Sequence, residues 1–187
     1  MGLATLYDSR FVTDFDHGGV ILFHCTPSHP NREARPTEIM NIRDYLIDLE
    51  GKDWNRLLGY WSHLLPTDAT LWLVNRLGEA FLSARDGTIV WLSVGTGELL
   101  NVAPAREAFA RLLDIPQNAD TWLRISLVDD CRRAGMNLGA DECYGFKIPP
   151  ALLGRLDASN MHPTNIYSHY SWLSHLSRQD EIYWTGD

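Results

Sequence analysis

The sequence has few cysteines and no long apolar run, and each of these shortages excludes a class of protein. The 187-residue chain has three cysteines, namely Cys25, Cys131 and Cys143. Their odd number and the lack of a CxxC pair exclude a disulfide framework and a zinc-finger spacing. The longest apolar runs, such as Leu71–Val74, have four residues, whereas a helix that spans a bilayer needs about 20. Asp8 and Arg10 interrupt the segment where a secretory signal needs an apolar core, so we expect a reduced, cytoplasmic setting.

The charge of the chain is strongly one-sided. Acidic residues outnumber basic ones by 24 to 16, which gives a net charge of −8, and Lys52 and Lys147 are the only lysines. Such a chain does not bind nucleic acid through a phosphate-neutralising surface. It attracts basic partners, because long-range fields raise association rates and favour complementary surfaces. Solubility alone is the other explanation of the charge, and composition leaves both open.

The N-terminal part differs from the rest of the chain. Residues 1–39 carry no helical periodicity and end in a turn-rich run, Thr26–Asn31. Within them, Val20–His24 has the pattern of a single strand. We expect an N-terminal extension or small lobe on a main domain of residues 40–187. Because the first well-patterned segment opens at Met40, translation can alternatively begin there.

The first half of the main domain changes from helical to strand periodicity. Residues 54–65 carry one apolar stripe of a helix, with Asp53 as its N-cap and Pro66 as its stop. Four runs of strand-forming residues follow: Leu71–Asn75, Ala80–Ala84, Thr88–Val94 and Glu98–Val102. Asp86-Gly87 predicts a two-residue hairpin turn in which both residues have positive φ. We therefore predict a four-stranded antiparallel meander.

The second half mixes helices and strands without a βαβ alternation. Pro104 opens a helix that ends before Pro116, and Asn118 caps a second helix that runs to Ala134, with Gly135 as its left-handed cap. The remaining expected elements are strands at Tyr144–Ile148 and Asn165–Tyr170, and a terminal helix at Trp172–Gln179 whose first residue faces inward. This order predicts the α+β class, with an antiparallel β-meander packed against helices and a short N-terminal extension.

One cysteine and three histidines supply the main enzymatic alternative. A Cys–His pair can form a thiolate nucleophile, and Cys143 precedes His162, His169 and His175 in the sequence. A cysteine beside an expected strand is, however, more often a small buried apolar residue. The histidine spacings of seven and six residues do not place two ligands on one helical face, so we expect no metal and no cofactor. An enzyme that uses Cys143 with His162 or His169 stays open as an alternative.

Two pairs of neighbouring acids are candidates for a functional surface. Asp129 and Asp130 point about 100° apart on a helix and are expected to form a solvated face. Asp141 and Glu142 lie in a glycine-flanked connection, where exposure and contact with a partner are expected. Asp141 and Glu142 are therefore the predicted partner-binding residues.

Several segments are similar to those of one known family. They are Leu71–Leu82, Asp86–Gly87, Trp91–Glu98, Cys143–Pro150 and His169–Ser171. These segments resemble the C-terminal domain of immunity proteins that accompany DNase effectors of bacterial type VI secretion systems. The resemblance runs from about Met40 to about Asp180, and the tyrosine–glycine–aromatic motif followed by two prolines is its most specific part. The family usually has two successive glycines after the prolines, whereas this chain keeps one, Gly154.

The resemblance implies an immunity protein, and the absence of a nucleophile–base motif leads us to expect no catalytic activity. Such a protein binds a secreted DNase toxin, as a monomer in a one-to-one complex, and occludes its active site or its DNA-binding surface. The acidic charge agrees with this function, because a nuclease is positively charged where it holds phosphates. A regulatory interaction module unrelated to toxins is the other alternative.

Overall fold

The computed structural model describes residues 41–184, with side chains up to Arg178. The chain divides into two units between Asp44 and Tyr45. Residues 41–44 are the described part of the first unit, and they enter a short 3₁₀ helix, η1 (Ile42–Tyr45).

Some predictions concern residues beyond this range. The expected strand Val20–His24 and the alternative start at Met40 lie outside the described residues. The boundary between an extension of residues 1–39 and a domain of residues 40–187 stays a prediction.

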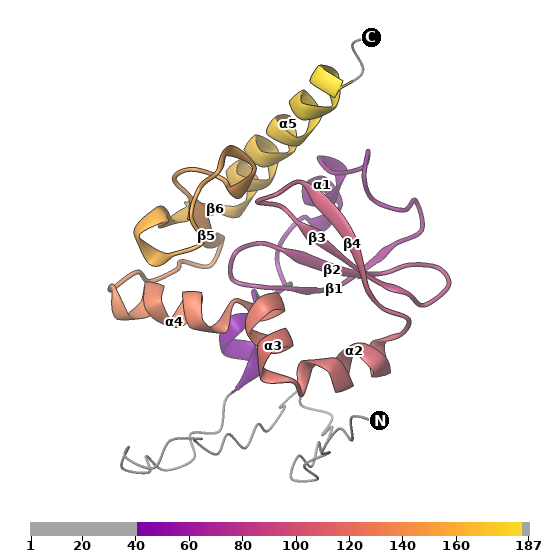
Figure 1. Cartoon of the computed structure of the whole chain (residues 1–187), viewed down its shortest axis with the longest axis horizontal. Coiled ribbons are helices and arrows are strands. Elements are labelled where there is room, and N and C mark those ends of the chain that lie inside the picture. The colour runs from indigo at the N-terminus through magenta and orange to yellow at the C-terminus, as the bar shows by residue number, and fades with distance from the viewer. Residues whose placement is uncertain (1–40, 185–187) are drawn as a thin grey trace, which may run out of the picture. The chain divides into compact units, whose positions relative to one another are not determined.

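The centre of the second unit is a four-stranded antiparallel sheet (Figure 1). Its strands are β1 (Thr70–Val74), β2 (Ala80–Ser83), β3 (Ile89–Ser93) and β4 (Glu98–Ala103). They pair in the order of the sequence, which confirms the predicted meander. The register shifts between Leu71 and Leu73 of β1, so Trp72 is the extra residue of a bulge. The ring of Trp72 packs edge-on against Phe109 at a centroid distance of 5.5 Å.

The turn between β2 and β3 differs in type from the expected one. Gly87 has a φ of +88°, but Asp86 is not among the residues with positive φ. The N–H of Gly87 donates to Ala84 O at 3.0 Å, and the N–H of Ala84 donates to Thr88 O at 2.8 Å. The connection is therefore a three-residue turn that closes on a left-handed glycine, and it needs positive φ at one position only.

The first helix of this unit, α1 (Trp54–Gly59), is shorter than the predicted helix over residues 54–65. Its start is as predicted, because the Asp53 side chain caps it. Beyond the helix the chain continues in tighter turns, one of them closed by a hydrogen bond from Trp61 N to Leu58 O at 2.9 Å. The glycine that ends α1 weakens helix continuation. The tighter turns leave the Trp61 side chain fully buried.

Three short helices follow the sheet: α2 (Arg106–Leu113), α3 (Pro116–Leu123) and α4 (Ile125–Arg133). The prediction of one continuous helix from Asn118 to Ala134 is wrong, because Arg124 has a φ of +56° and separates α3 from α4. Pro116 opens α3, since proline suits the first helical position. Gly135, with a φ of +79°, ends α4 as predicted.

A small sheet and a long helix complete the unit. The two antiparallel strands are β5 (Glu142–Phe146) and β6 (Met161–Asn165), and α5 (Ile166–Trp184) follows directly. The predicted strand over residues 165–170 is wrong, because the Asn165 side chain accepts hydrogen bonds from the first-turn N–H groups of the helix. Trp172 also differs from the prediction, since it is 44% exposed rather than turned inward.

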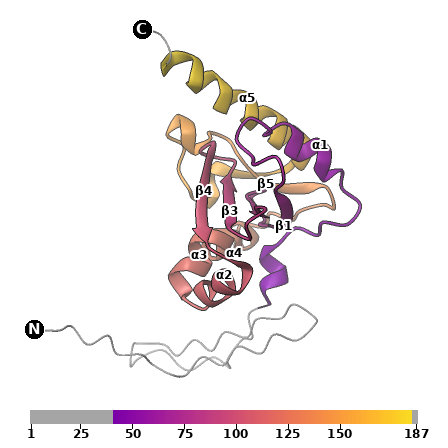
Figure 2. The ribbon, with the colours of Figure 1, turned by 90° about the vertical axis from the view of Figure 1, so that its right-hand side faces the viewer.

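The helices lie on both sides of the main sheet. Figures 1 and 2 show α2, α3 and α4 on one side of β1–β4 and α1 and α5 on the other. On the first side, Phe109 packs between Phe81 at 5.2 Å and Trp122 at 4.8 Å between ring centroids. Burying one such ring is worth about 1.5–3 kcal/mol. This arrangement confirms the α+β class and the meander packed against helices. Within residues 41–184, no helix combines the length and the apolar character that a membrane span requires.

Candidate partner-binding surface

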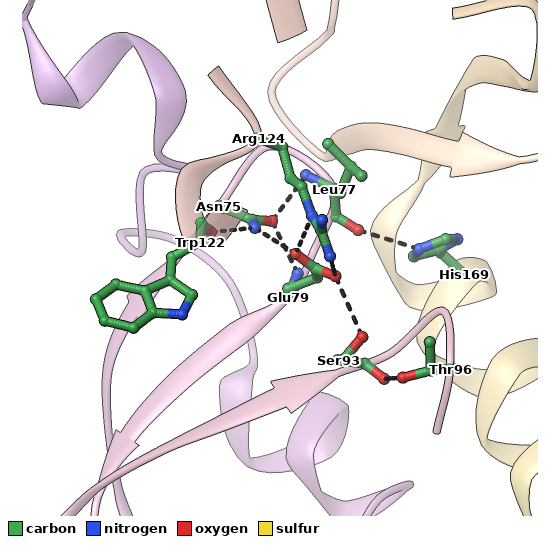
Figure 3. A network of polar contacts seen from close by, with 8 residues as sticks. All are labelled: Asn75, Leu77, Glu79, Ser93, Thr96, Trp122, Arg124 and His169. Atoms are coloured by element: carbon green, nitrogen blue, oxygen red, sulfur yellow. Dashed lines mark hydrogen bonds and ion pairs between the residues drawn. The ribbon is translucent and has the colours of Figure 1, made fainter. Parts of the chain in front are cut away.

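A buried carboxylate, Glu79, lies at the centre of the polar network in Figure 3. Its side chain is 1% exposed and accepts hydrogen bonds from Arg124 Nη2 at 3.0 Å and Nε at 3.1 Å. Asn75 Nδ2 donates to it at 2.7 Å and Ser93 Oγ at 3.3 Å. Asn75 Nδ2 also donates to Trp122 O at 2.8 Å. The network therefore joins the β1–β2 connection, β3 and the α3–α4 junction.

Arg124 explains why α3 and α4 are separate helices. Its backbone is left-handed, a conformation that costs about 1–2 kcal/mol for a residue with a Cβ. Its guanidinium binds Glu79 through two nitrogens and lies 5.4 Å from the ring centroid of Trp91. The guanidinium makes these contacts because the helix breaks at this position. The backbone strain at Arg124 is therefore offset by the interactions of its side chain with Glu79 and Trp91.

The geometry around Cys143 does not favour a thiolate nucleophile. The Cys143 side chain is fully buried, and burial raises its pKa far above the usual value, with a further contribution from Glu142. His169 is also buried, which lowers its pKa to about 4, and its Nε2 lies 3.2 Å from Leu77 O. His169 is therefore neutral at physiological pH and donates a hydrogen bond to the backbone.

A pocket of about 350 Å³ lies beside His169. His162, Lys147 and Trp172 are among its lining residues, and Cys143 is not. The predicted Cys143–His162 or Cys143–His169 pair therefore brings no thiol to this pocket. Among the side chains that the structure describes, no group of three or more His, Cys, Asp or Glu residues is arranged to hold a metal ion.

The predicted partner-binding residues Asp141 and Glu142 are adjacent but have different surroundings. The Asp141 side chain is 58% exposed, and its carboxylate lies 3.8 Å from Lys52 Nζ, whose side chain is 5% exposed. Glu142 is half-buried, and its Oε2 accepts a hydrogen bond from Gly139 N at 2.7 Å. Asp141 is therefore available to a partner at the cost of its contact with Lys52, whereas Glu142 also holds the turn before β5. Their role at an interface stays a prediction.

The acids of α4 form ion pairs along their own helix. Asp129 pairs with Arg132 at 3.8 Å and also accepts a hydrogen bond from Tyr45 Oη at 3.1 Å. Asp130 pairs with Arg133. Both carboxylates are partly solvated, as expected for an exposed helix face, and each pair is worth less than about 1 kcal/mol.

The connection between β5 and β6 carries an apolar surface that the sequence predictions missed. We call residues 148–157 the apolar loop. Of the seven large apolar residues exposed in the described part of the chain, four lie in it: Ile148 (53% exposed), Leu152 (52%), Leu153 (94%) and Leu156 (46%). Nothing in the run Pro149–Leu153 marks these side chains as exposed, because a short apolar run is equally typical of a core segment.

Several backbone contacts hold the apolar loop in one shape. Asn160, which is 8% exposed, accepts a hydrogen bond from Ile148 N at 3.0 Å and donates to Ile148 O and to Arg155 O. Ala151 N donates to Gly95 O at 3.1 Å, which ties the loop to the β3–β4 turn. At Gly154 a Cβ would lie 1.7 Å from Ile148 O, so only glycine fits there. The leucines are thus presented on a rigid backbone.

The apolar loop ends at a small acidic pocket. The pocket has a volume of about 250 Å³, and three of its lining residues are acidic: Asp120, Asp130 and Asp157. Arg124 also lines it, but its guanidinium is engaged by Glu79. Leu156 lines the same pocket, so apolar and acidic surface are continuous here. The 3₁₀ helix η3 (Ala158–Asn160), which follows the loop, contacts α4.

Comparison with known proteins places the resemblance in the second half of the chain. Residues 103–177 match the family described as T6SS immunity protein Tdi1, C-terminal. The matched range begins at the last residue of β4 and includes α2, α3, α4, the small sheet, the apolar loop and most of α5. Over this range the chain therefore resembles type VI secretion immunity proteins, and the range includes two of the motif segments, Cys143–Pro150 and His169–Ser171. A comparison with curated proteins gives no match.

Proposed function

We propose that this chain is an immunity protein that binds a secreted DNase toxin of a type VI secretion system in the cytoplasm of the producing cell. The observation that carries the proposal is the match of residues 103–177 to a type VI immunity family. The net charge of −8 supports the choice of a nuclease, because a nuclease needs a basic surface to hold phosphates. A folded acidic protein competes for that surface and blocks the active site or the DNA path.

The proposed mechanism needs no chemical step from the chain itself. The buried Cys143 thiol, with its raised pKa, is a poor nucleophile, and the neutral His169 is committed to Leu77 O. Binding therefore supplies the protection, in a one-to-one complex. Asp141 is one proposed contact, since its carboxylate is exposed beside the small sheet. Asp141→Asn tests this contact because it removes the charge and keeps a polar group facing Lys52.

Co-expression tests the function directly. The toxin gene beside this chain's gene is expressed in a susceptible bacterium, alone and together with the full-length chain. We expect growth to be restored and the chromosome to stay intact when both are present. Continued DNA degradation in the presence of abundant folded chain contradicts the proposal. A toxin variant that lacks nuclease activity is the control for toxicity unrelated to DNA.

Salt dependence tests the role of charge. The association rate should fall as ionic strength rises from about 0.01 M to 0.15 M, since the Debye length shrinks from about 30 Å to about 8 Å. The dissociation rate should change much less, because it depends on the desolvated centre of the interface. An association rate that is independent of salt removes charge steering from the proposal and leaves binding to be explained by shape and apolar contact.

A further inference from the structure

We propose that the apolar loop and the acidic pocket at its end form the surface on which the toxin docks, with the leucines at the centre and a basic toxin side chain in the pocket. This inference rests on the proposed function and specifies its interface. It places the main contact at residues 148–157 and on the adjoining parts of α3 and α4, rather than only at the predicted acids Asp141 and Glu142.

The apolar content of the loop supports a protein partner. Leu153 is 94% exposed, and Ile148 and Leu152 are each more than half exposed. Such a group of large apolar side chains on one short segment costs solubility in a free protein, and larger exposed patches of this kind mark interaction sites. Interfaces have an apolar centre surrounded by polar residues. The loop supplies such a centre, and the basic residues Lys147, just before the loop, and Arg155, within it, are exposed.

The backbone at Leu153 supports a role for its side chain outside the fold. Leu153 has a φ of +63°, and a bulky residue in this region is uncommon because its Cβ crowds the backbone. Glycine or asparagine fills such a position with less strain. A strained residue persists where something else requires it, and functional sites are where such residues gather. Inside this fold the exposed Leu153 side chain gains almost no packing in return.

The adjacent pocket supports a basic partner. Its three acidic residues, Asp120, Asp130 and Asp157, face one opening, and Arg124 is neutralised by Glu79. The ion pairs of Asp130 with Arg133 and of Asp157 with Arg155 use arginine side chains that are 73% and 85% exposed. Exposed pairs of this kind are weak and exchange partners at little cost. A volume of about 250 Å³ is below the roughly 300–1,000 Å³ of small-molecule sites, which favours a single side chain.

The rigidity of the loop favours tight binding. Asn160, Gly154 and the Ala151–Gly95 hydrogen bond fix its shape before any partner arrives. A preorganised surface loses less conformational entropy on association than a flexible one. The structure therefore predicts that the loop keeps its conformation when the toxin binds.

The test measures affinity between the full-length chain and the neighbouring toxin, purified with its catalytic centre inactivated. Leu153→Asp places a charge at the centre of the proposed surface, and aspartate tolerates positive φ better than leucine does. Leu100→Asp is the control, because Leu100 is an exposed leucine (43%) that belongs to β4 and not to residues 148–157. We expect Kd to rise at least tenfold for Leu153→Asp and less than threefold for Leu100→Asp, with both variants folded by circular dichroism.

A second pair of variants tests the pocket. Asp120→Asn with Asp130→Asn removes two charges, and the asparagine at position 120 can still accept the hydrogen bond from Ser126 N. The control removes the same charge elsewhere, as Asp68→Asn with Glu107→Gln. We expect at least a fivefold loss of affinity for the pocket pair and at most a twofold loss for the control pair.

The outcomes separate the inference from the proposed function. If the wild-type chain binds the toxin and Leu153→Asp binds as tightly as Leu100→Asp, the docking surface is wrong and the immunity function stands. If the pocket pair and the control pair lose affinity equally, the pocket is not the site of a basic contact. If the wild-type chain does not bind the toxin at all, the proposed function itself fails.

Discussion

Arg124 and Leu153 are the two non-glycine residues with left-handed backbone in the described part of the chain, and they differ in what their side chains gain. The Arg124 guanidinium binds the buried Glu79 carboxylate and stacks on Trp91. The Leu153 side chain is almost entirely in solvent. At Arg124, contacts of the side chain with the core therefore offset the backbone strain. At Leu153, the side chain makes almost no contact in the free chain that could offset it. Backbone strain by itself therefore does not identify a functional residue. The contacts of the side chain show whether the strained residue serves the fold or a partner.

The largest expected effect concerns Arg124. Arg124→Gly relieves the backbone strain but leaves the Glu79 carboxylate buried without a counter-charge, which costs about 3–5 kcal/mol. We expect a loss of this size in chemical denaturation monitored by tryptophan fluorescence. Arg124→Lys should fall in between, because a lysine keeps the charge but cannot donate through two fixed nitrogens. A loss below about 1 kcal/mol for Arg124→Gly contradicts the role given to this network.

The second largest expected effect is a pH dependence of stability that the buried His169 causes. Burial holds the pKa of His169 near 4, whereas an unfolded histidine titrates near 6.5. The unfolded state therefore binds more protons between these values, and stability should fall by up to about 3 kcal/mol as pH falls from 6.5 to 4, with no contribution above that window. His169→Gln should flatten this part of the profile.

Gly154 tests the rigidity of the apolar loop. Gly154→Ala places a Cβ where Ile148 O now lies, so the loop has to change shape, at a cost of about 1–3 kcal/mol. If the loop is the docking surface, affinity for the toxin falls together with its shape. Gly59→Ala is the control, since a Cβ at Gly59 meets no atom within 4 Å. Full affinity in a folded Gly154→Ala variant would show that the loop conformation is irrelevant to binding.

The smallest effect has the opposite sign. Leu153→Asn relieves the left-handed strain and removes no buried contact, so the free chain should gain about 1 kcal/mol in stability. Binding should weaken in the same variant, because the apolar centre of the surface is lost. A variant that is more stable and binds less well is the pattern of a residue kept for function. A loss of stability for Leu153→Asn would mean that the leucine packs within the fold.

Much of the fold could be predicted from local patterns. The meander could be predicted from four short strand-like runs. The start of α1 after Asp53 and the end of α4 before Gly135 could be predicted from their cap residues. The break at Arg124 could not be predicted, because the guanidinium that requires it reaches Glu79, a residue 45 positions away. The start of α5 at Ile166 was not predicted, because its first residues include β-branched and aromatic residues that favour strands. In the structure the Asn165 cap outweighs this preference.

The candidate surface was harder to predict than the fold. The acids Asp141 and Glu142 stand out in the sequence, whereas exposure of the leucines depends on how the loop is held by Asn160 and Gly95. A run such as Ala151-Leu152-Leu153 is indistinguishable from a core segment in a sequence. Asp120, Asp130 and Asp157 come together only when α3, α4 and the loop are assembled.

Hydrogen–deuterium exchange on the wild-type chain, free and bound to the inactivated toxin, tests the central claim most directly. The account predicts that bound toxin slows exchange in peptides that cover residues 148–157 and the adjoining parts of α3 and α4. It also predicts little change in peptides of β4 around Leu100. Slower exchange confined to other segments, with residues 148–157 unchanged in a complex of confirmed stoichiometry, would contradict the account.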